Sequence, residues 1–118
     1  MTEKEIKSLV GRQRKYFQTG ATLPVGTRIS ALRRLYNAIS KHKKEISGAL
    51  RKDLGKSAFE SYMCETGMVL EELSYMLRHT PRLAREKRFR TPLAQFHSKS
   101  FRKPSPYGVT LIMSPWNY

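Results

Sequence analysis

The side chains best suited to chemistry in this sequence are one cysteine and three histidines, and their spacing favours structural roles. Cys64 has no histidine close to it in sequence, whereas a reactive thiol needs a nearby cation or helix N-terminus. We therefore interpret Cys64 as a small core residue. His42, His79 and His97 lack the spacing of metal ligands and stand among basic residues that would repel a cation. We interpret them as solvated surface residues, and the sequence predicts no metal site.

Four glutamates fall within one predicted helix and are interpreted as ion-pair partners for the many basic residues rather than as a catalytic pair. They are Glu60, Glu65, Glu71 and Glu72. No P-loop and no G-x-G-x-x-G fingerprint is present. A single cysteine excludes an intrachain disulfide and favours a reducing compartment. No run approaches the roughly 20 apolar residues of a membrane span. We therefore expect a soluble cytoplasmic protein.

The charge of the chain is strongly unbalanced. Among 118 residues, 23 are Lys or Arg and 9 are Asp or Glu, which gives a formal net charge of +14. Half of that excess lies in residues 82–103, which also carry Phe89, Phe96 and Phe101. Basic residues interleaved with aromatics are typical of single-strand binders, so a small basic helical nucleic-acid-binding module is the alternative hypothesis. A helical interaction protein without chemistry is a third possibility.

The elements that must position any site are mostly helices. Apolar spacings of three and four predict a helix over residues 2–19, and a second helical stretch over 26–53 that breaks near 40–42. A third periodic stretch begins at Ser57, and Pro81 is expected to interrupt it, with a short continuation to about Arg88. Thr2 with Glu5, and Ser57 with Glu60, form predicted capping boxes. Gly20 and Gly55 suit helix ends.

The last part of the chain has a different character. His97–Arg102 suits an extended edge strand, and residues 107–113 form an apolar, β-rich run typical of a strand buried on both faces. Such a strand needs neighbours for its backbone groups, and no other buried strand is evident. The chain is therefore expected to be truncated.

The tail carries the most specific motif. Pro106-Tyr107-Gly108-Val109, a strand, and then Pro115-Trp116-Asn117-Tyr118 resemble the entry to the active site in the aldehyde dehydrogenase superfamily. Asp53-Leu54-Gly55-Lys56 and the run 65–73 are similar to the helices at the N-terminus of that superfamily. They resemble most the class 3 branch, which oxidises medium-chain, fatty and aromatic aldehydes.

The resemblance implies an α/β parent with a Rossmann-like fold, of which this chain would be a mostly α-helical N-terminal fragment. Residues 1–88 would be a helical segment, 89–106 a basic extended arm used in subunit pairing, and 107–118 the start of the dinucleotide-binding domain. The parent would be an NAD(P)-dependent enzyme that oxidises aldehydes to carboxylic acids through a cysteine thioester. A homodimer is implied, and the choice between NAD and NADP stays open.

The site residues implied by the resemblance all lie at the C-terminal end. Asn117 matches the position whose side-chain amide stabilises the anionic oxygen of the reacting aldehyde. Met113, Ser114, Pro115 and Trp116 match the turn that lines the cofactor cleft at the end of the strand. Cys64 does not match the nucleophile, and the general-base glutamate and glycine-rich motif are absent from this chain. The 118 residues alone are therefore expected to be inactive.

Overall fold

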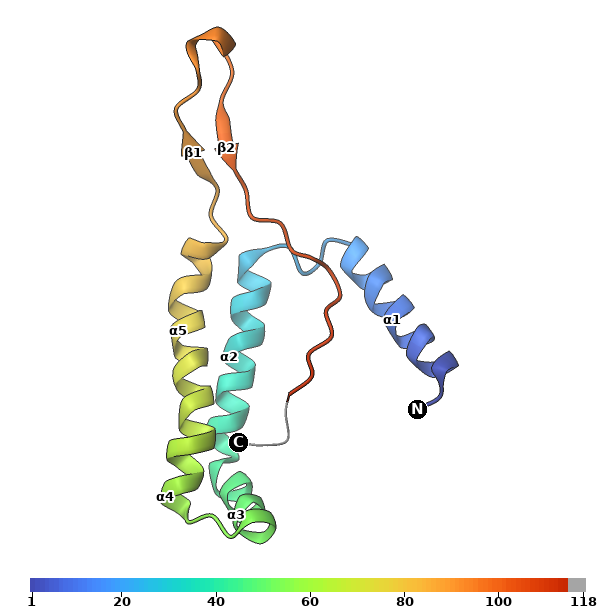
Figure 1. The fold of residues 1–118 in the computed structure, drawn as a ribbon, viewed down its shortest axis with the longest axis vertical. Helices are drawn as coiled ribbons and strands as arrows, with labels where there is room; N and C mark the ends of the chain where they lie inside the picture. The colour runs from blue at the N-terminus through green and yellow to red at the C-terminus, as the bar shows by residue number, and fades with distance from the viewer. Residues whose placement is uncertain (115–118) are drawn as a thin grey trace.

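The chain is helical over most of its length, with one small β-hairpin (Figure 1). This computed structural model describes residues 1–114; Pro115, Trp116, Asn117 and Tyr118 lie outside the described residues. The first helix, α1 (Glu3–Gln18), begins with a reciprocal cap. The Glu5 carboxylate accepts the Thr2 backbone N–H at 2.7 Å, and the Thr2 hydroxyl accepts the Glu5 N–H at 3.4 Å. Gly20, at φ +76°, follows its end. The predicted capping box of Thr2 with Glu5 and the predicted helix end at Gly20 are both confirmed.

The second helical stretch is divided in two, as its apolar pattern predicts. Helix α2 (Val25–Lys41) and helix α3 (Lys43–Leu54) meet at His42, whose φ and ψ of −97° and 13° are not helical. Gly55 ends α3 in the left-handed region, at φ +67°, where a side chain would be strained. The chain can therefore reverse there and return along α2.

The return begins at a second capping box. Helix α4 (Ala58–Ser61) follows Ser57, whose hydroxyl accepts the Glu60 N–H at 3.2 Å. The Glu60 carboxylate accepts the Ser57 N–H at 2.9 Å, and this hydrogen bond is the main reason why the pKa of Glu60 lies below its ordinary 4.5. Replacing Ser57 with alanine should lower the free energy of unfolding by about 1 kcal/mol, as loss of such caps usually does. Urea denaturation measures it.

The lowered pKa of Glu60 also predicts a pH dependence of stability. The folded state favours the ionised carboxylate, so this contribution is present above pH 4.5 and is lost as the pH falls through the folded pKa. The loss should be smaller in Glu60→Gln, whereas Glu72→Gln, which removes a carboxylate but leaves the cap intact, should behave like the unmodified chain. Urea midpoints at pH 6 and pH 3 measure the difference. Equal losses in both variants would contradict this role of Glu60.

A π-helical turn, η1 (Tyr62–Thr66), connects α4 to the long helix α5 (Gly67–Leu83). The Gly67 N–H donates to the carbonyl of Tyr62, five residues back. A Cβ added at Gly67 would lie 2.5 Å from that carbonyl oxygen, closer than such atoms approach. The wide turn therefore depends on glycine at this position. Sequence periodicity alone gives no sign of it.

The prediction that Pro81 interrupts this helix is wrong. Helix α5 continues through Pro81 to Leu83, and the Ala84 N–H donates to the Thr80 carbonyl at 2.9 Å. Proline removes one hydrogen bond, to the carbonyl of Leu77, and because only two helical residues follow Pro81, any bend that it causes affects only the helix end. The continuation to Arg88 is also absent, because residues 87–89 form a strand.

The packed part of the molecule is the contact between α2 and α5, which run side by side (Figure 1). Leu70 and Leu73 of α5 are the buried apolar side chains of the described residues. Other members of the predicted apolar stripe are exposed, among them Phe59 at 73% and Met63 at 54%. The stripe thus identifies an apolar face, but only its centre is covered.

The basic arm is a hairpin that projects beyond the helices (Figure 1). Strand β1 (Lys87–Phe89) pairs antiparallel with β2 (Ser100–Arg102), with Arg88 opposite Phe101. A 3₁₀ turn, η2 (Leu93–Gln95), lies at its tip, and Ser100 donates its N–H to the Thr91 hydroxyl at 3.0 Å. The expected strand near 97–102 is confirmed over 100–102.

The whole chain is far from compact. Its radius of gyration is 20.2 Å, whereas a compact domain of this length has about 13.5 Å. It exposes 10730 Å², about 4,000 Å² more than a compact monomer of its mass would expose. A large permanent interface buries about 1,000–2,500 Å² on each partner, so this excess on one chain is larger than one such interface needs. The exposed apolar surface is therefore suited to contact with further polypeptide.

Candidate functional site

The C-terminal segment, where the sequence places the site, is extended and unpaired over its described part. Residues 107–114 form no strand, so the strand expected over 107–113 is absent from the described residues. Leu111, Ile112 and Met113 are exposed at 83%, 84% and 82%. The physical reason is the lack of a partner: the chain's described strands are the two of the hairpin, which pair with each other.

The predicted site residues are accordingly not brought together within the described chain. Met113 and Ser114 lie on the extended segment with exposed side chains. Pro115, Trp116 and Asn117 lie outside the described residues, so their roles stay predictions. The structure therefore describes only the extended segment that leads to the motif, which contains Pro104, Pro106 and Gly108.

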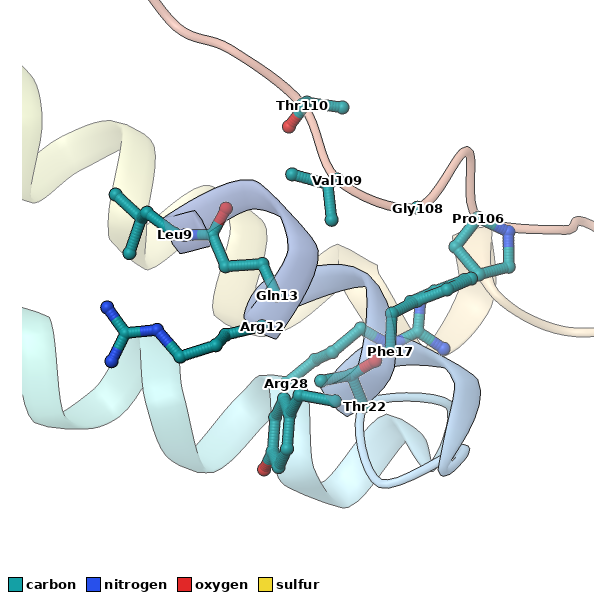
Figure 2. A pocket seen from close by; sticks show the side chains of 11 residues that line it. Leu9, Arg12, Gln13, Phe17, Thr22, Arg28, Pro106, Gly108, Val109 and Thr110 are labelled. Atoms are coloured by element: carbon teal, nitrogen blue, oxygen red, sulfur yellow. The ribbon is translucent and has the colours of Figure 1, made fainter. Parts of the chain in front are cut away.

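That approach lies against α1. Gly108 has φ +107°, a left-handed conformation that disfavours other residues, and a Cβ there would lie 3.6 Å from the Phe17 ring. Together α1 and residues 106–110 border a groove of about 640 Å³ (Figure 2). Arg28 of α2 lines this groove and also a smaller hollow of about 210 Å³ near the end of α5. The extended segment thus crosses α1, α2 and α5 at one place.

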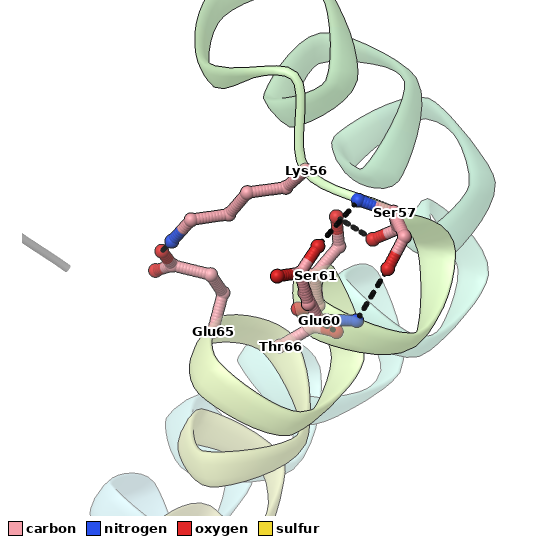
Figure 3. Close-up of polar contacts among 6 residues, drawn as sticks. All are labelled: Lys56, Ser57, Glu60, Ser61, Glu65 and Thr66. Atoms are coloured by element: carbon pink, nitrogen blue, oxygen red, sulfur yellow. Dashed lines mark hydrogen bonds and ion pairs between the residues drawn. The ribbon is translucent and has the colours of Figure 1, made fainter.

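Two of the four glutamates, Glu60 and Glu65, have defined structural contacts (Figure 3). Glu65 forms a half-buried ion pair with Lys56, which holds the start of the return stretch against η1. Glu60 belongs to the helix cap rather than to an ion pair. The buried hydroxyls beside them bond back to the helix, since Ser61 donates to the Ser57 carbonyl at 2.8 Å. The expected pairing with basic residues is confirmed for Glu65.

The cysteine and the histidines make local contacts and do not gather into a site within the described residues. Cys64 is half-buried in η1. His79 is half-buried at the surface, where its ring stacks on Tyr75 at 3.9 Å between centroids and its Nδ1 lies 2.7 Å from the Tyr75 carbonyl oxygen. His42 is exposed and lies 3.0 Å from Glu45. Across residues 1–114, no three His, Cys, Asp or Glu side chains gather as metal ligands would.

The hairpin concentrates positive charge and exposed aromatic rings. The Arg102 guanidinium lies over the Phe89 ring at 5.6 Å, and Phe89, Phe96 and Phe101 are exposed at 54%, 77% and 56%. This surface can take either an apolar, acidic protein partner or the bases and phosphates of a single strand. In the part of the chain that the structure describes, no helix is long and apolar enough to cross a membrane.

Sequence reasoning missed two residues that the structure singles out. Gly67 permits the π-helical turn, and the only sequence signal was a glycine inside an otherwise regular helix. Arg28 lies where three elements meet, and nothing in the local pattern distinguishes it from Arg33 or Arg34. Both depend on contacts between segments distant in sequence.

A sequence model described as the aldehyde dehydrogenase family matches residues 1–118. The chain is 36% identical over 115 residues to the dimeric NADP-preferring aldehyde dehydrogenase of Canis lupus familiaris. The aligned residues cover 97% of this chain and 25% of that protein. It is 35% identical over 103 residues to the 4,4'-diaponeurosporen-aldehyde dehydrogenase of Staphylococcus aureus, covering 87% of this chain and 22% of that protein.

A family 3 relative is similar to the same degree. The aldehyde dehydrogenase family 3 member A2 of Mus musculus is 33% identical over 107 residues, which cover 91% of this chain and 22% of that protein. The chain spans about a quarter of the length of the curated relatives that it matches.

Proposed function

The chain belongs to the aldehyde dehydrogenase family, and from this premise we propose that it is the N-terminal part of an NAD(P)-dependent enzyme that oxidises aldehydes to carboxylic acids. The observation that supports the proposal most strongly is the family match over the whole chain, ending in Pro115-Trp116-Asn117-Tyr118. The large exposed apolar surface is also what a part of a larger fold would present.

The proposed contribution of this chain to the reaction is the Asn117 amide. When a cysteine thiolate supplied by the rest of the protein adds to the aldehyde carbon, the carbonyl oxygen becomes negative. An asparagine amide is an uncharged donor that does not titrate, so it can stabilise that oxygen without competing for protons. Pro115, by fixing its own φ, would hold the amide in place.

The described residues do not by themselves fit a dinucleotide. Met113 and Ser114 are exposed, and no described strand runs into a helix N-terminus that could hold the phosphates. We propose that residues 113–116 line one wall of the cofactor cleft in the complete enzyme, and the other walls come from polypeptide beyond this chain. When bound there, NAD or NADP would accept the hydride.

The proposed substrates are medium-chain, fatty or aromatic aldehydes. Support comes from the class 3 resemblance of the sequence and from relatives that are named as family 3 aldehyde dehydrogenases. We place the enzyme in the cytoplasm, because its single cysteine in this region suits a reducing compartment.

The hairpin is proposed as the subunit-pairing element of a homodimer. Its strands are short and its apolar rings are exposed, so pairing with another chain would cover surface that is otherwise left to water. The dog relative is named as dimeric. A nucleic-acid role for the same hairpin predicts tight, salt-sensitive binding of single-stranded RNA that is lost when Arg88 and Arg90 are neutralised. We expect no such binding at physiological salt.

The longer reading frame that carries this sequence tests the proposal. The purified protein should reduce NAD or NADP in the presence of hexanal or benzaldehyde, as followed by absorbance of the reduced cofactor. Heat-inactivated protein and an alcohol in place of the aldehyde are the controls. A well-folded protein that oxidises neither aldehyde with either cofactor would contradict the proposed function.

A further inference from the structure

The groove between α1 and the extended segment has the size of a small-molecule site (Figure 2). Its volume of about 640 Å³ is within the range of roughly 300–1,000 Å³ that such sites have. Its walls are mostly apolar, with Leu9 and Phe17 on one side and Val109 on the other. Leu9, Gln13 and Phe17 recur every four residues, so they share one face of α1.

The charge of the groove has one sign. Arg12 and Arg28 line it, and no acidic side chain does. Neither arginine forms an ion pair with another residue of the described chain. Arg28 donates one hydrogen bond, from Nη2 to the Leu23 carbonyl at 3.0 Å, and its Nε is enclosed without a partner among the described residues. A guanidinium has five N–H donors, so the terminal groups of Arg28 have donors left for an anion.

We propose that this groove binds a medium-chain carboxylate, whose alkyl chain lies along Leu9, Phe17 and Val109 and whose carboxylate pairs with Arg28. Carboxylate geometry matches the planar donor fork of a guanidinium. Leu9 and Phe17 are eight positions apart, which corresponds to about 12 Å along the helix and gives an alkyl chain a continuous apolar wall. Arg12 adds a second positive charge to the same groove.

The residues that the proposed carboxylate would contact, Leu9, Phe17, Arg28 and Val109, are not among those proposed for catalysis or cofactor binding. A failure of this proposal would therefore leave the proposed function as it stands, and loss of aldehyde oxidation would leave the groove untouched. The titration is carried out on the 118-residue chain once circular dichroism has shown that it forms its helices, and also on the longer protein that the proposed function assumes.

The experiment is a titration of the chain with decanoate, below its micelle concentration, followed by NMR of backbone and arginine side-chain N–H groups. We expect saturable shifts at residues 9–17 and 106–110 and at the Arg28 side chain. Affinity should rise up to about four-fold for each added methylene from octanoate to dodecanoate. Neutral decanol should bind at least about ten-fold more weakly, because it lacks the charge that Arg28 pairs with.

Two variants test the charge. Arg28→Gln should weaken decanoate binding about ten-fold, and Arg33→Gln, which removes an exposed charge from the same helix, should not weaken it. Arg28→Gln could also disturb α2, because it loses the hydrogen bond to the Leu23 carbonyl. In that case the comparison of decanoate with decanol on the unmodified chain still tests whether the charge contributes to binding. A second pair of variants lies on α1. Arg12→Gln removes a charge that lines the groove and should weaken decanoate binding, whereas Arg14→Gln removes an exposed charge outside it and should not.

The proposal would be overturned by absence of saturable binding, by equal binding of decanol and decanoate, or by equal loss of affinity with Arg28→Gln and Arg33→Gln. A carboxylate free in solution is distinguished from an anionic lipid surface by vesicles of phosphatidylglycerol. Shifts produced by those vesicles at the same residues and at lower lipid concentration than decanoate would also contradict it, because the preferred occupant would then be a membrane.

Discussion

Replacing Asn117 with alanine should lower the kcat of aldehyde oxidation by about 10²–10³ in the enzyme that carries this chain, the usual cost of losing one donor to a developing oxyanion. The donor acts where charge develops, so kcat and kcat/KM should fall together while KM changes little. Steady-state kinetics with hexanal, at saturating cofactor, measure both constants.

The matched control for Asn117 is the other asparagine of the chain. Asn37 is exposed on α2, so Asn37→Ala should leave both constants within about two-fold of the unmodified enzyme. Asn117→Asp should be at least as impaired as Asn117→Ala, because a carboxylate adds a negative charge beside the oxyanion. Unchanged kcat in Asn117→Ala, with correct folding shown by circular dichroism, would refute the role given to this amide.

Replacing Gly67 with alanine should destabilise the chain by about 1–3 kcal/mol, the typical cost of forcing an extra group into occupied space. The added Cβ would lie 2.5 Å from the Tyr62 carbonyl oxygen, which is backbone and cannot rotate away. Relief requires the π-helical turn to rewind, and rewinding would rotate η1 and its residue Glu65 relative to Lys56. Urea denaturation followed by circular dichroism measures the loss.

Gly48 provides the control for this effect. It lies in the middle of α3, and a Cβ there meets nothing within 4 Å. Gly48→Ala should therefore stabilise the chain by about 0.5–1 kcal/mol, because alanine favours helix and restricts the unfolded state. Opposite signs for the two glycines are expected; destabilisation of equal size at both positions would show that the π-helical turn is not the cause.

Most features of the fold that the sequence predicts correctly are set by residues close together in the chain. Both capping boxes, the left-handed Gly20 and Gly55, and the division at His42 depend on residues within a few positions of each other. Such features are set by hydrogen bonds and backbone conformation that the sequence displays directly. They define where helices begin and end, but they do not define which surfaces meet.

The errors arose where distant contacts decide. Pro81 is tolerated because it falls in the last helical turn, a position that depends on where residues 84–87 leave the helix. The run 107–113 has the composition of a buried strand, but a strand needs a neighbour to pair with. The position of Arg28 between α1, α2 and the extended segment, and the π-helical turn at Gly67, also depend on contacts between distant residues. The proposed C-terminal site, in contrast, rests only on the resemblance of residues 106–118 to a known family and stays a prediction.

The proposed role of Asn117 is tested most directly by a crystal structure of the complete enzyme with an aldehyde bound to its nucleophile. We predict the Asn117 side-chain nitrogen at about 2.7–3.1 Å from the oxygen derived from the aldehyde, within donor range of the oxyanion. An Asn117 side chain turned away from that oxygen, with another residue donating in its place, would contradict the proposed role.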